Sequence, residues 1–559
     1  MPLGKCAALG VLGTALTVFS FVASDSGGPA AGAVSIFGQF QEIGAKDFKS
    51  YQINKRVCEY PSRYDLDTPL DSFLTFKYLE SEGRQGLYRS VNSFRIRGFF
   101  PAAGSPDSEI KPGARDKLLQ TKIKEIIVYK DSIAGVITDY VEPMCIITYL
   151  SLEDGKWLNA GEGLGNDLTD ARKRFEENAA VFSSFIDRIR EMKSGPADPA
   201  AFIDYLRQHG RAPKEFILDA LSRHKIIVYG EIHRRRSSWD LLKTVIRDPH
   251  FAEKVGTIFM ELSSDKQNRL DEYFESDEMD TGIILDIFRD VQINGWYDKG
   301  MYEFLEDAWK INEKLPKAQR IRVVAVDESR PFRSFTTQEE LENHFRNALN
   351  RNTQMAEIIA ETVRAQRDKR NSLFVVGVAH AYKSAVPGIA VGRPKNGPQP
   401  TAAAQLVKVF GDKEVFSIFQ HCPIISNDGT VLGKIRNGLF DKAFAATRNR
   451  PVAFDLRHSP FGAEPFDGIY EVSYKKDAGS WDNNYDAFLY LEPLESEAPE
   501  YLLYDVINDA YVKELARRAE MMKTSVNKWF DVEEVTAEAI ISKLKSQHEN
   551  QKRWPSIKE

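Results

Sequence analysis

Short, almost continuously apolar runs alternate with helical periodicity along the second half of this chain. The apolar runs lie at residues 225–230, 257–260, 322–326, 373–378 and 415–419. Helical patterns separate or follow them at residues 237–246, 266–274, 301–315, 338–349, 355–367 and 402–410. Runs of this length without polar alternation are typical of strands that are buried on both faces of a parallel sheet. The alternation predicts an α/β domain with a mostly parallel sheet flanked by helices.

The first part of the chain has a different pattern. Thr68-Pro69 precedes an apolar-periodic stretch that reads as a capped helix with proline in its first turn. Runs of β character then follow at residues 124–129, 132–138 and 144–150, and another strand is expected from Gly155. Residues 34–60 are expected to form a strand or an extended entry. This order predicts a smaller α+β unit in which a helix packs on a curved sheet.

The chain has 559 residues, which is too long for one ordinary core. An amphipathic helix at 167–192 and the Gly/Pro-rich stretch 193–199 mark the best boundary. We expect a late strand near residue 452 and another near residue 488. The predicted organisation is a signal peptide and linker (1–33), an α+β unit (34–165), a connecting helix and linker (166–198), an α/β domain (199–500) and a helical tail (501–559) that is partly mobile at its end.

Composition excludes one class of partner. Hydrophobic residues make up 42% and charged residues 28% of the chain, as in an ordinary globular protein. The formal net charge of −6 gives no electrostatic footprint for nucleic acid, so no nucleic-acid partner is expected. The tight basic cluster Arg234-Arg235-Arg236 is expected to face an anionic ligand or solvent.

The first residues have the pattern of a targeting segment. Lys5 is followed by an uncharged apolar stretch from Cys6 to Ala23, and polar residues 24–28 then break the run. We expect a secretory signal, and hence a periplasmic or secreted protein. The alternative is an uncleaved single-span anchor, which would be the protein's one association with a membrane. Cys6 precedes the hydrophobic stretch, which argues against a lipoprotein.

Cysteine usage leaves two alternatives open. Cys6 would leave with the signal, and no Cys-x-x-Cys pair exists, which excludes a zinc ribbon. Cys58 and Cys145 could form a disulfide in an oxidising compartment or could be two buried thiols.

A repeated motif supplies the candidate chemistry. Gly-x-x-His occurs as Gly230-Glu-Ile-His233 and as Gly377-Val-Ala-His380, each time at the end of an apolar run. Two other runs deliver Glu261 and Asp327 in the same position, and a fifth leads into His421. Open α/β sheets hold their ligands at the carboxyl ends of their strands. The sequence therefore predicts a single polar rim, and its candidate residues are Glu231, His233, Glu261, Asp327 and His380.

Imidazole and carboxylate groups that converge can act in two ways. His233, Glu261 and His380 can hold a divalent metal ion such as manganese, zinc or cobalt, whose bound water is acidified. Alternatively a histidine can act as general base while Glu231 orients the water and Asp327 supports these groups without touching the substrate. A single histidine after a strand more often caps a helix, but two in the same motif favour function. Glu261 could instead initiate a helix, Asp327 is equally compatible with capping, and His421 is expected to be structural.

These motifs, in this order, resemble the erythromycin esterase, ChaN, TraB and TIKI superfamily. The resemblance covers about residues 200 to 495 and includes Arg351-Asn-Thr-Gln-Met-Ala356, which is similar to the helix before the last motif in that clan. It implies an α/β sandwich whose cleft is lined by Glu231, His233, Glu261 and His380. Members include metal-dependent peptidases, a macrolide lactone hydrolase with a histidine base, and haem-binding lipoproteins. The first unit resembles the cone-shaped cystatin-like fold of the nuclear transport factor two type.

The leading functional hypothesis is an extracytoplasmic hydrolase of an ester, lactone or peptide bond in a small-molecule or peptide substrate. The alternative is a haem- or iron-uptake-related ligand-binding protein without turnover, in which His233 or His380 is an axial ligand. A third hypothesis is an interaction module in which the cone-like unit recognises a partner. The sequence leaves the substrate, the metal and the oligomeric state open.

Overall fold

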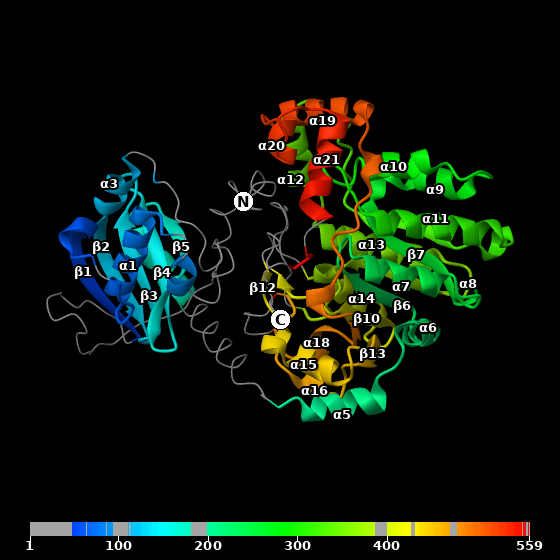
Figure 1. Ribbon diagram of the computed structural model, residues 1–559, viewed down its shortest axis with the longest axis horizontal. Helices are drawn as coiled ribbons and strands as arrows, with labels where there is room; N and C mark the ends of the chain where they lie inside the picture. Colours follow the sequence, from blue (N-terminus) through cyan, green and yellow to red (C-terminus); the bar gives the residue numbers. More distant parts are fainter. Residues whose placement is uncertain are drawn as a thin grey trace.

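The protein contains two separate main sheets, one with five strands and one with seven (Figure 1). The computed structural model describes residues 47–62, 64–84, 87–92, 110, 113–179, 198–385, 400–425, 431–469, 478–549, 552–554 and 557. The expected signal segment at 1–33 lies outside the described residues. Among the described residues, no helix has the length and apolar character needed to cross a membrane.

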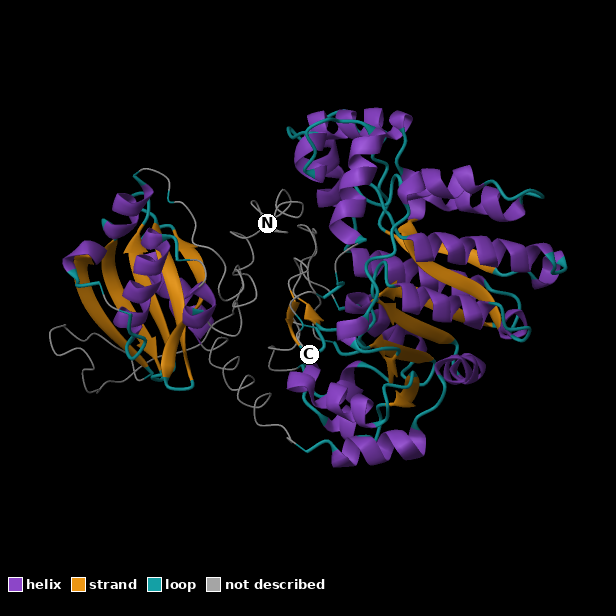
Figure 2. Ribbon diagram, viewed as in Figure 1, coloured by secondary structure: helices purple, strands orange, loops and turns teal. Residues whose placement is uncertain are grey.

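The first sheet is antiparallel throughout and follows the chain order. Its strands are β1 (Phe48–Arg56), β2 (Lys122–Tyr129), β3 (Ile133–Asp139), β4 (Cys145–Glu153) and β5 (Lys156–Gly165). The helices α1 (Pro69–Glu82), α2 (Tyr88–Val91) and α3 (Ala114–Leu119) accompany it, and α1 lies across the curved strands (Figure 2). The hydroxyl of Thr68 accepts a hydrogen bond from the backbone N–H of Asp71, so α1 begins at the predicted cap.

Both faces of this sheet are covered. Phe73 of α1 packs in the same core as Ile126 and Val128, whereas Phe175, from the helix over residues 168–179, packs with Ile127 on the other face. Successive residues of a strand point to opposite faces, which explains this division. The remainder of the predicted connecting helix and its linker, from 180 to 197, lies outside the described residues.

The cysteines of this unit are not bridged, since Cys58 is an exposed thiol and Cys145 a buried one. Of the two alternatives, the disulfide is therefore wrong, and the expectation of two buried thiols holds for Cys145 alone.

The second sheet has the strand order β13-β14-β10-β6-β9-β7-β8. Its strands are β6 (Ile226–Glu231), β7 (Val255–Ser263), β8 (Arg322–Asp327), β9 (Asn371–Gly377), β10 (Val415–Gln420), β13 (Val452–Asp455) and β14 (Ala487–Tyr490). The five apolar runs form five adjacent strands, and all of these are parallel, which confirms the predicted mostly parallel sheet. Only β13, at one edge, runs antiparallel to its neighbour. A separate short hairpin joins β11 (Ile424–Ile425) and β12 (Val431–Gly433).

Helices enclose this sheet on both faces. They are α5 (Ala200–His209), α6 (Pro213–Arg223), α7 (Arg236–Ile246), α8 (Phe251–Lys254), α9 (Gln267–Glu275), α10 (Thr281–Phe288), α11 (Lys299–Glu313), α12 (Gln338–Asn347), α13 (Arg351–Ala365), α14 (Ala402–Phe410), α15 (Leu439–Ala446), α16 (Pro460–Ala463) and α18 (Trp481–Asn484). Ile227 and Tyr229 of β6 belong to one core, and Ile226 and Val228 belong to the other. Burial on both faces explains why the strands read as continuous apolar runs.

The last part of the chain is also packed. Its helices are α19 (Asp509–Met521), α20 (Val526–Phe530) and α21 (Ala537–His548). Beyond them, Trp554 and Ile557 are buried in the core that contains α5, α13 and α14. The apolar side chains at these two positions are thus removed from water and tie this part of the predicted helical tail to the core.

Candidate functional site

The carboxyl ends of four adjacent parallel strands carry the predicted residues. Strand β6 ends at Glu231 with His233 just beyond it, β7 contains Glu261, and β8 ends at Asp327. His380 lies in the short 3-10 helix Val378–His380 that directly follows β9. Because the strand order is β6-β9-β7-β8, these ends lie side by side at one edge of the sheet. The geometric part of the prediction, a single polar rim, agrees with this arrangement.

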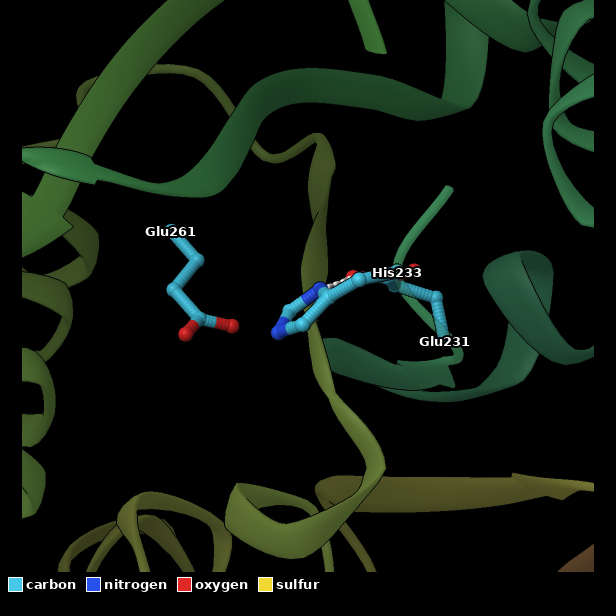
Figure 3. A group of neighbouring side chains, drawn as sticks. All are labelled: Glu231, His233 and Glu261. Atoms are coloured by element: carbon cyan, nitrogen blue, oxygen red, sulfur yellow. Dashed lines mark hydrogen bonds and ion pairs between the residues drawn. The ribbon is translucent and has the colours of Figure 1, made fainter. Parts of the chain in front are cut away.

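Glu231 and His233 form a carboxylate–imidazole pair. Oε1 of Glu231 contacts Nδ1 of His233, which leaves Nε2 pointing toward the carboxylate of Glu261 (Figure 3). The Glu231 side chain is 1% exposed, whereas 36% of the His233 side chain is exposed. A buried carboxylate thus fixes the orientation of an imidazole whose other nitrogen faces the site, as in hydrolytic triads.

The charges around this pair favour the imidazolium form of His233. Burial alone would lower the pKa of His233, but Glu231, Glu261 and Asp298 outweigh it and raise the pKa to about 9. Burial raises the pKa of Glu231, and the neighbouring His233 partly offsets that shift. The pair therefore holds a proton at neutral pH.

Glu261 is held from two sides. The backbone N–H of Gly377 donates to its Oε2 at 2.6 Å, and the guanidinium of Arg351 contacts its Oε1. Glycine at position 377 has a steric reason, because a Cβ there would lie 3.2 Å from Nε2 of His233 and 3.3 Å from Oε2 of Glu261. The glycine of the second motif thus leaves room between the two groups.

Arg351 connects Glu261 to Asp327. Its Nε and Nη2 donate to the two oxygens of Asp327 at 2.5 and 2.7 Å, a bidentate arrangement. Burial alone would raise the pKa of Asp327, but Arg330 and Arg351 outweigh it and hold the pKa well below its usual range. Burial is similarly outweighed at Glu261, mainly by Arg351 and His233, and its pKa is lowered. Asp327 thus reaches the rim through Arg351, and both carboxylates stay ionised.

His380 has the opposite protonation state to His233. Its Nδ1 lies 2.7 Å from Oδ1 of Asn352, and its Nε2 lies 4.0 Å from Oε1 of Glu261. Burial and the positive charge of Arg351 lower the pKa of His380 to about 4. The amide oxygen of Asn352 accepts the Nδ1 proton, so Nε2 carries a free lone pair toward the site.

The rim also fits a divalent cation in kind and spacing. One ligand atom from each of Glu231, His233 and Glu261 lies within 4.8 Å of the others. Oε2 of Glu231 is buried and has no hydrogen-bond partner among the described residues. Nitrogen and carboxylate donors suit zinc, manganese or cobalt. The predicted ligand set is His233, Glu261 and His380, whereas the group that meets this spacing has Glu231 in place of His380. His380 lies beside it, with Nε2 4.0 Å from Oε1 of Glu261.

His421 and the basic cluster at 234–236 do not contribute to the rim. His421 is fully buried among the rings of Phe444, Phe488 and Tyr490, which agrees with its expected structural role. Arg234 and Arg235 of the basic cluster pair with Glu500 and Glu497, at 3.2 and 2.7 Å. The expectation that this cluster faces an anionic ligand or solvent is therefore wrong for Arg235, which is buried against a buried carboxylate, whereas 31% of the Arg234 side chain is exposed. Arg236 is 57% exposed and stacks on Tyr501.

The sequence did not identify three contributors to the rim. Arg351 and Asn352 open helix α13 and reach Glu261 and His380, and the quoted stretch from Arg351 to Ala356 contained them without assigning them roles. Asp298 is fully buried and accepts hydrogen bonds from the backbone N–H groups of Arg234 and Met301. Polar residues at the cap or in the first turn of a helix were the signal available.

Comparison with known proteins gives only distant likenesses. No family model matches the chain, and no curated protein matches it in sequence. Similar solved structures include a succinoglycan biosynthesis protein (10% identity, TM-score 0.39, covering 54% of this chain and 98% of that one) and a protein from Bacillus cereus (11% identity, TM-score 0.34, 53% and 98%). ChaN of Campylobacter jejuni, described with cofacial haem binding, is also similar (13% identity, TM-score 0.25, 39% and 89%). At such values the likeness carries no information on chemistry, and the site is interpreted from its own residues.

Proposed function

We propose that the protein hydrolyses an ester, lactone or peptide bond at the rim formed by Glu231, His233, Glu261 and His380. One observation carries this proposal. Both imidazoles are anchored through Nδ1, His233 by Glu231 and His380 by Asn352, so that both Nε2 atoms face Glu261. Two groups of identical chemistry whose environments separate their pKa values supply an acid and a base at the same pH.

The proposed reaction assigns each histidine one proton transfer. Nε2 of His380 accepts a proton from water, and the water oxygen bonds to the carbonyl carbon of the substrate. The bond from that carbon to the leaving oxygen or nitrogen then breaks, and Nε2–H of His233 protonates the leaving group. Proton exchange with solvent restores both histidines. Water is consumed, and the products are an acid and an alcohol from an ester, an acid and an amine from a peptide, or one hydroxy acid from a lactone.

The carboxylates and Arg351 keep these groups in place. Glu231 stabilises the imidazolium of His233, and Glu261 sits between the two Nε2 atoms. Arg351 holds Glu261 ionised and orients it through Asp327. If a divalent cation binds, Glu231, His233 and Glu261 would hold it, with His380 beside Glu261, and the cation would polarise a carbonyl and acidify water.

Purified protein tests this proposal directly. A panel of nitrophenyl esters, lactones and short peptides is assayed with the wild type and with His233→Ala, His380→Ala and His250→Ala. We expect the first two variants to lower kcat by about 100- to 10,000-fold while the protein stays folded, as judged by circular dichroism. His250 is 70% exposed and pairs with Glu253, so its variant is the matched control.

The same preparation distinguishes hydrolysis from ligand binding. No turnover of any substrate, together with a Soret band that appears with haemin and is lost in His233→Ala or His380→Ala, would replace hydrolysis by haem binding. Hydrolysis that both variants retain would contradict the proposed roles of the histidines.

A further inference from the structure

The loop that follows β6 has an unusual backbone conformation. Arg234, immediately after His233, has φ of 60°, in the left-handed region. A residue other than glycine pays about 1–2 kcal/mol to adopt this conformation, and it persists only where the surroundings over-determine it. Asp298 helps to stabilise this conformation, because its carboxylate accepts a hydrogen bond from the N–H of Arg234 at 2.8 Å.

A residue more than three hundred positions later holds the carbonyls of the same loop. Arg553 donates from Nη2 to the carbonyl oxygen of His233 at 2.5 Å and from Nη1 to that of Arg234 at 2.9 Å. The N–H of Tyr501 donates to the Arg234 carbonyl as well, at 2.9 Å. One guanidinium thus spans two consecutive carbonyls, the first of which belongs to the candidate acid of the site.

Arg553 is built into the fold. Its side chain is 4% exposed, and its Nε lies 3.3 Å from Oε1 of Glu497, a carboxylate that also pairs with Arg235 at 2.7 Å. Trp554 donates from Nε1 to the other oxygen of Glu497 at 2.7 Å. Trp554 and Ile557 are both buried in the core. A surface arginine would not have these buried partners. The contact of Arg553 with the loop is therefore held in place by the core.

We propose that Arg553 is a positioning residue for His233, and that Arg553, Trp554 and Ile557, here called the latch segment, fix the loop that carries this histidine. The catalytic consequence rests on the proposed function, whereas the structural consequence does not. Without the guanidinium, two carbonyls lose charge-assisted hydrogen bonds and the left-handed turn at Arg234 loses part of its support. The imidazole would then leave its alignment with Glu231 and Glu261.

Hydrogen exchange tests the latch independently of any substrate. Full-length wild type, Arg553→Ala, Arg553→Lys and Lys552→Ala are compared by mass spectrometry. We expect exchange of the amides at 231–236 to rise about tenfold or more in Arg553→Ala and to rise less in Arg553→Lys. Lys552 is the exposed neighbour of Arg553 and is the matched control, with no change expected. Unchanged exchange at 231–236 in Arg553→Ala would overturn the proposal.

A milder variant covers the case in which Arg553→Ala fails to fold. Trp554→Phe keeps an aromatic ring in the core and removes the hydrogen bond to Glu497. We expect faster exchange at 231–236 than in the wild type, with the rest of the protein unaffected. A uniform increase over the whole chain, or none at 231–236, would count against the latch.

Kinetics separate positioning from a general loss of structure. We expect Arg553→Ala to lower kcat by about 10- to 100-fold with little change in KM, and added methylguanidinium to restore part of the rate. If the wild type hydrolyses nothing, the proposed function fails while the exchange result still decides the latch. If the wild type is active and Arg553→Ala keeps full kcat although its loop is loosened, the positioning role is wrong.

Discussion

His233 and His380 differ only in what surrounds them. His233 contacts Glu231 and faces Glu261, and these carboxylates raise its pKa to about 9. Burial and Arg351 lower the pKa of His380 to about 4. Each group therefore has a different proton affinity in the folded chain from that in the unfolded chain, and stability must depend on pH.

The direction of that dependence differs for the two histidines. Between about 4 and 6.5 the unfolded chain protonates His380 but the folded chain does not, so the free energy of unfolding falls as pH is lowered. Between 6.5 and about 9 the folded chain keeps the proton on His233, so this contribution is lost as pH rises. We expect the free energy of unfolding of chelator-treated protein, measured with urea and plotted against pH, to fall in both ranges, which form the acid limb and the alkaline limb of the plot. His380→Ala should flatten the acid limb and His233→Ala the alkaline limb, whereas equal slopes in wild type and variants would contradict these assignments.

Gly377 provides a second prediction for a single residue. Gly377→Ala would place a methyl group against both His233 and Glu261, so one of them must move by a few tenths of an ångström. We expect a loss of about 1–3 kcal/mol in the free energy of unfolding and about 100-fold in kcat/KM.

Gly433 is the control for this substitution, because a Cβ at Gly433 meets no atom of the described residues within 4 Å. Gly433→Ala should leave both quantities unchanged. An unaltered rate in Gly377→Ala would show that the gap between Nε2 of His233 and Glu261 is not used in catalysis.

At the scale of elements, helix termini bring the supporting groups to the rim. Arg351 and Asn352 are the first residues of α13, and Asp298 is the cap of α11. Asp298 accepts from the N–H of Met301 at 3.0 Å, from that of Arg234 at 2.8 Å and from Nε1 of Trp239 at 3.1 Å. The cap of α11 therefore also supports the His233 loop.

Asp298→Ala is expected to affect both folding and chemistry. Removing the carboxylate loses a helix cap and leaves buried donors without a partner, at a cost of about 2–3 kcal/mol. It should also lower kcat, because the His233 loop loses its bond at Arg234. Chemical denaturation and steady-state kinetics measure the two effects.

Asp280→Ala is the matched control, because Asp280 is an exposed cap of α10 that accepts from Gly282 N–H at 2.9 Å. We expect about 1 kcal/mol of destabilisation and an unchanged kcat. Equal effects of the two substitutions on kcat would show that α11 does not support the site.

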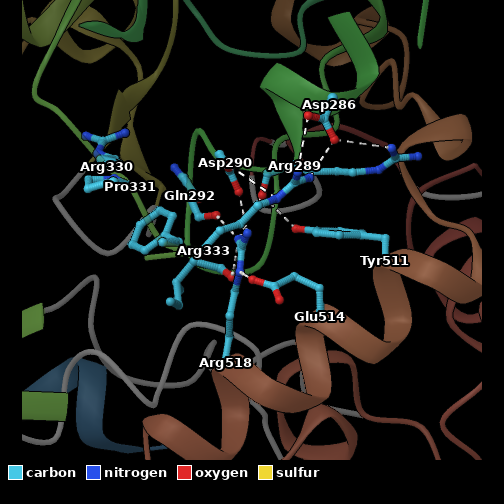
Figure 4. Close-up of polar contacts among 12 residues, drawn as sticks. Asp286, Arg289, Asp290, Gln292, Arg330, Pro331, Arg333, Tyr511, Glu514 and Arg518 are labelled. Atoms are coloured by element: carbon cyan, nitrogen blue, oxygen red, sulfur yellow. Dashed lines mark hydrogen bonds and ion pairs between the residues drawn. The ribbon is translucent and has the colours of Figure 1, made fainter. Parts of the chain in front are cut away.

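Helix α19 is fixed by buried charges (Figure 4). Arg518 is fully buried, forms an ion pair with Asp290 and donates to the carbonyl of Arg289 at 2.8 Å. Glu514, one turn earlier, accepts from Nε of Arg518 at 2.7 Å. A buried arginine must be paired in this way because an isolated charge in the core is costly.

At the scale of the whole molecule, the two main sheets share no strand, and each has its own cores. We therefore expect a fragment of residues 199–559 to fold alone, to unfold in a single transition and to keep the kcat/KM of the full chain. Circular dichroism melts and the hydrolysis assay measure this. A fragment that folds but loses activity would assign the first unit a part in substrate recognition.

The sequence by itself determined the strands of the parallel sheet and the rim at which they end. Five apolar runs became five adjacent parallel strands, because burial on both faces leaves a pattern that is visible without any tertiary information. The position of Glu231, His233, Glu261 and His380 followed from the same rule, since parallel strands end at the same edge.

Only the tertiary structure decided how the rim is charged and held. The opposite pKa shifts of the two histidines arise from neighbours that are distant in sequence, such as Arg351 beside His380. The hydrogen bond from Arg553 to the His233 carbonyl joins residues 320 positions apart. No local pattern encodes such contacts, because they depend on how packed elements place side chains and on the loss of solvent screening that packing brings.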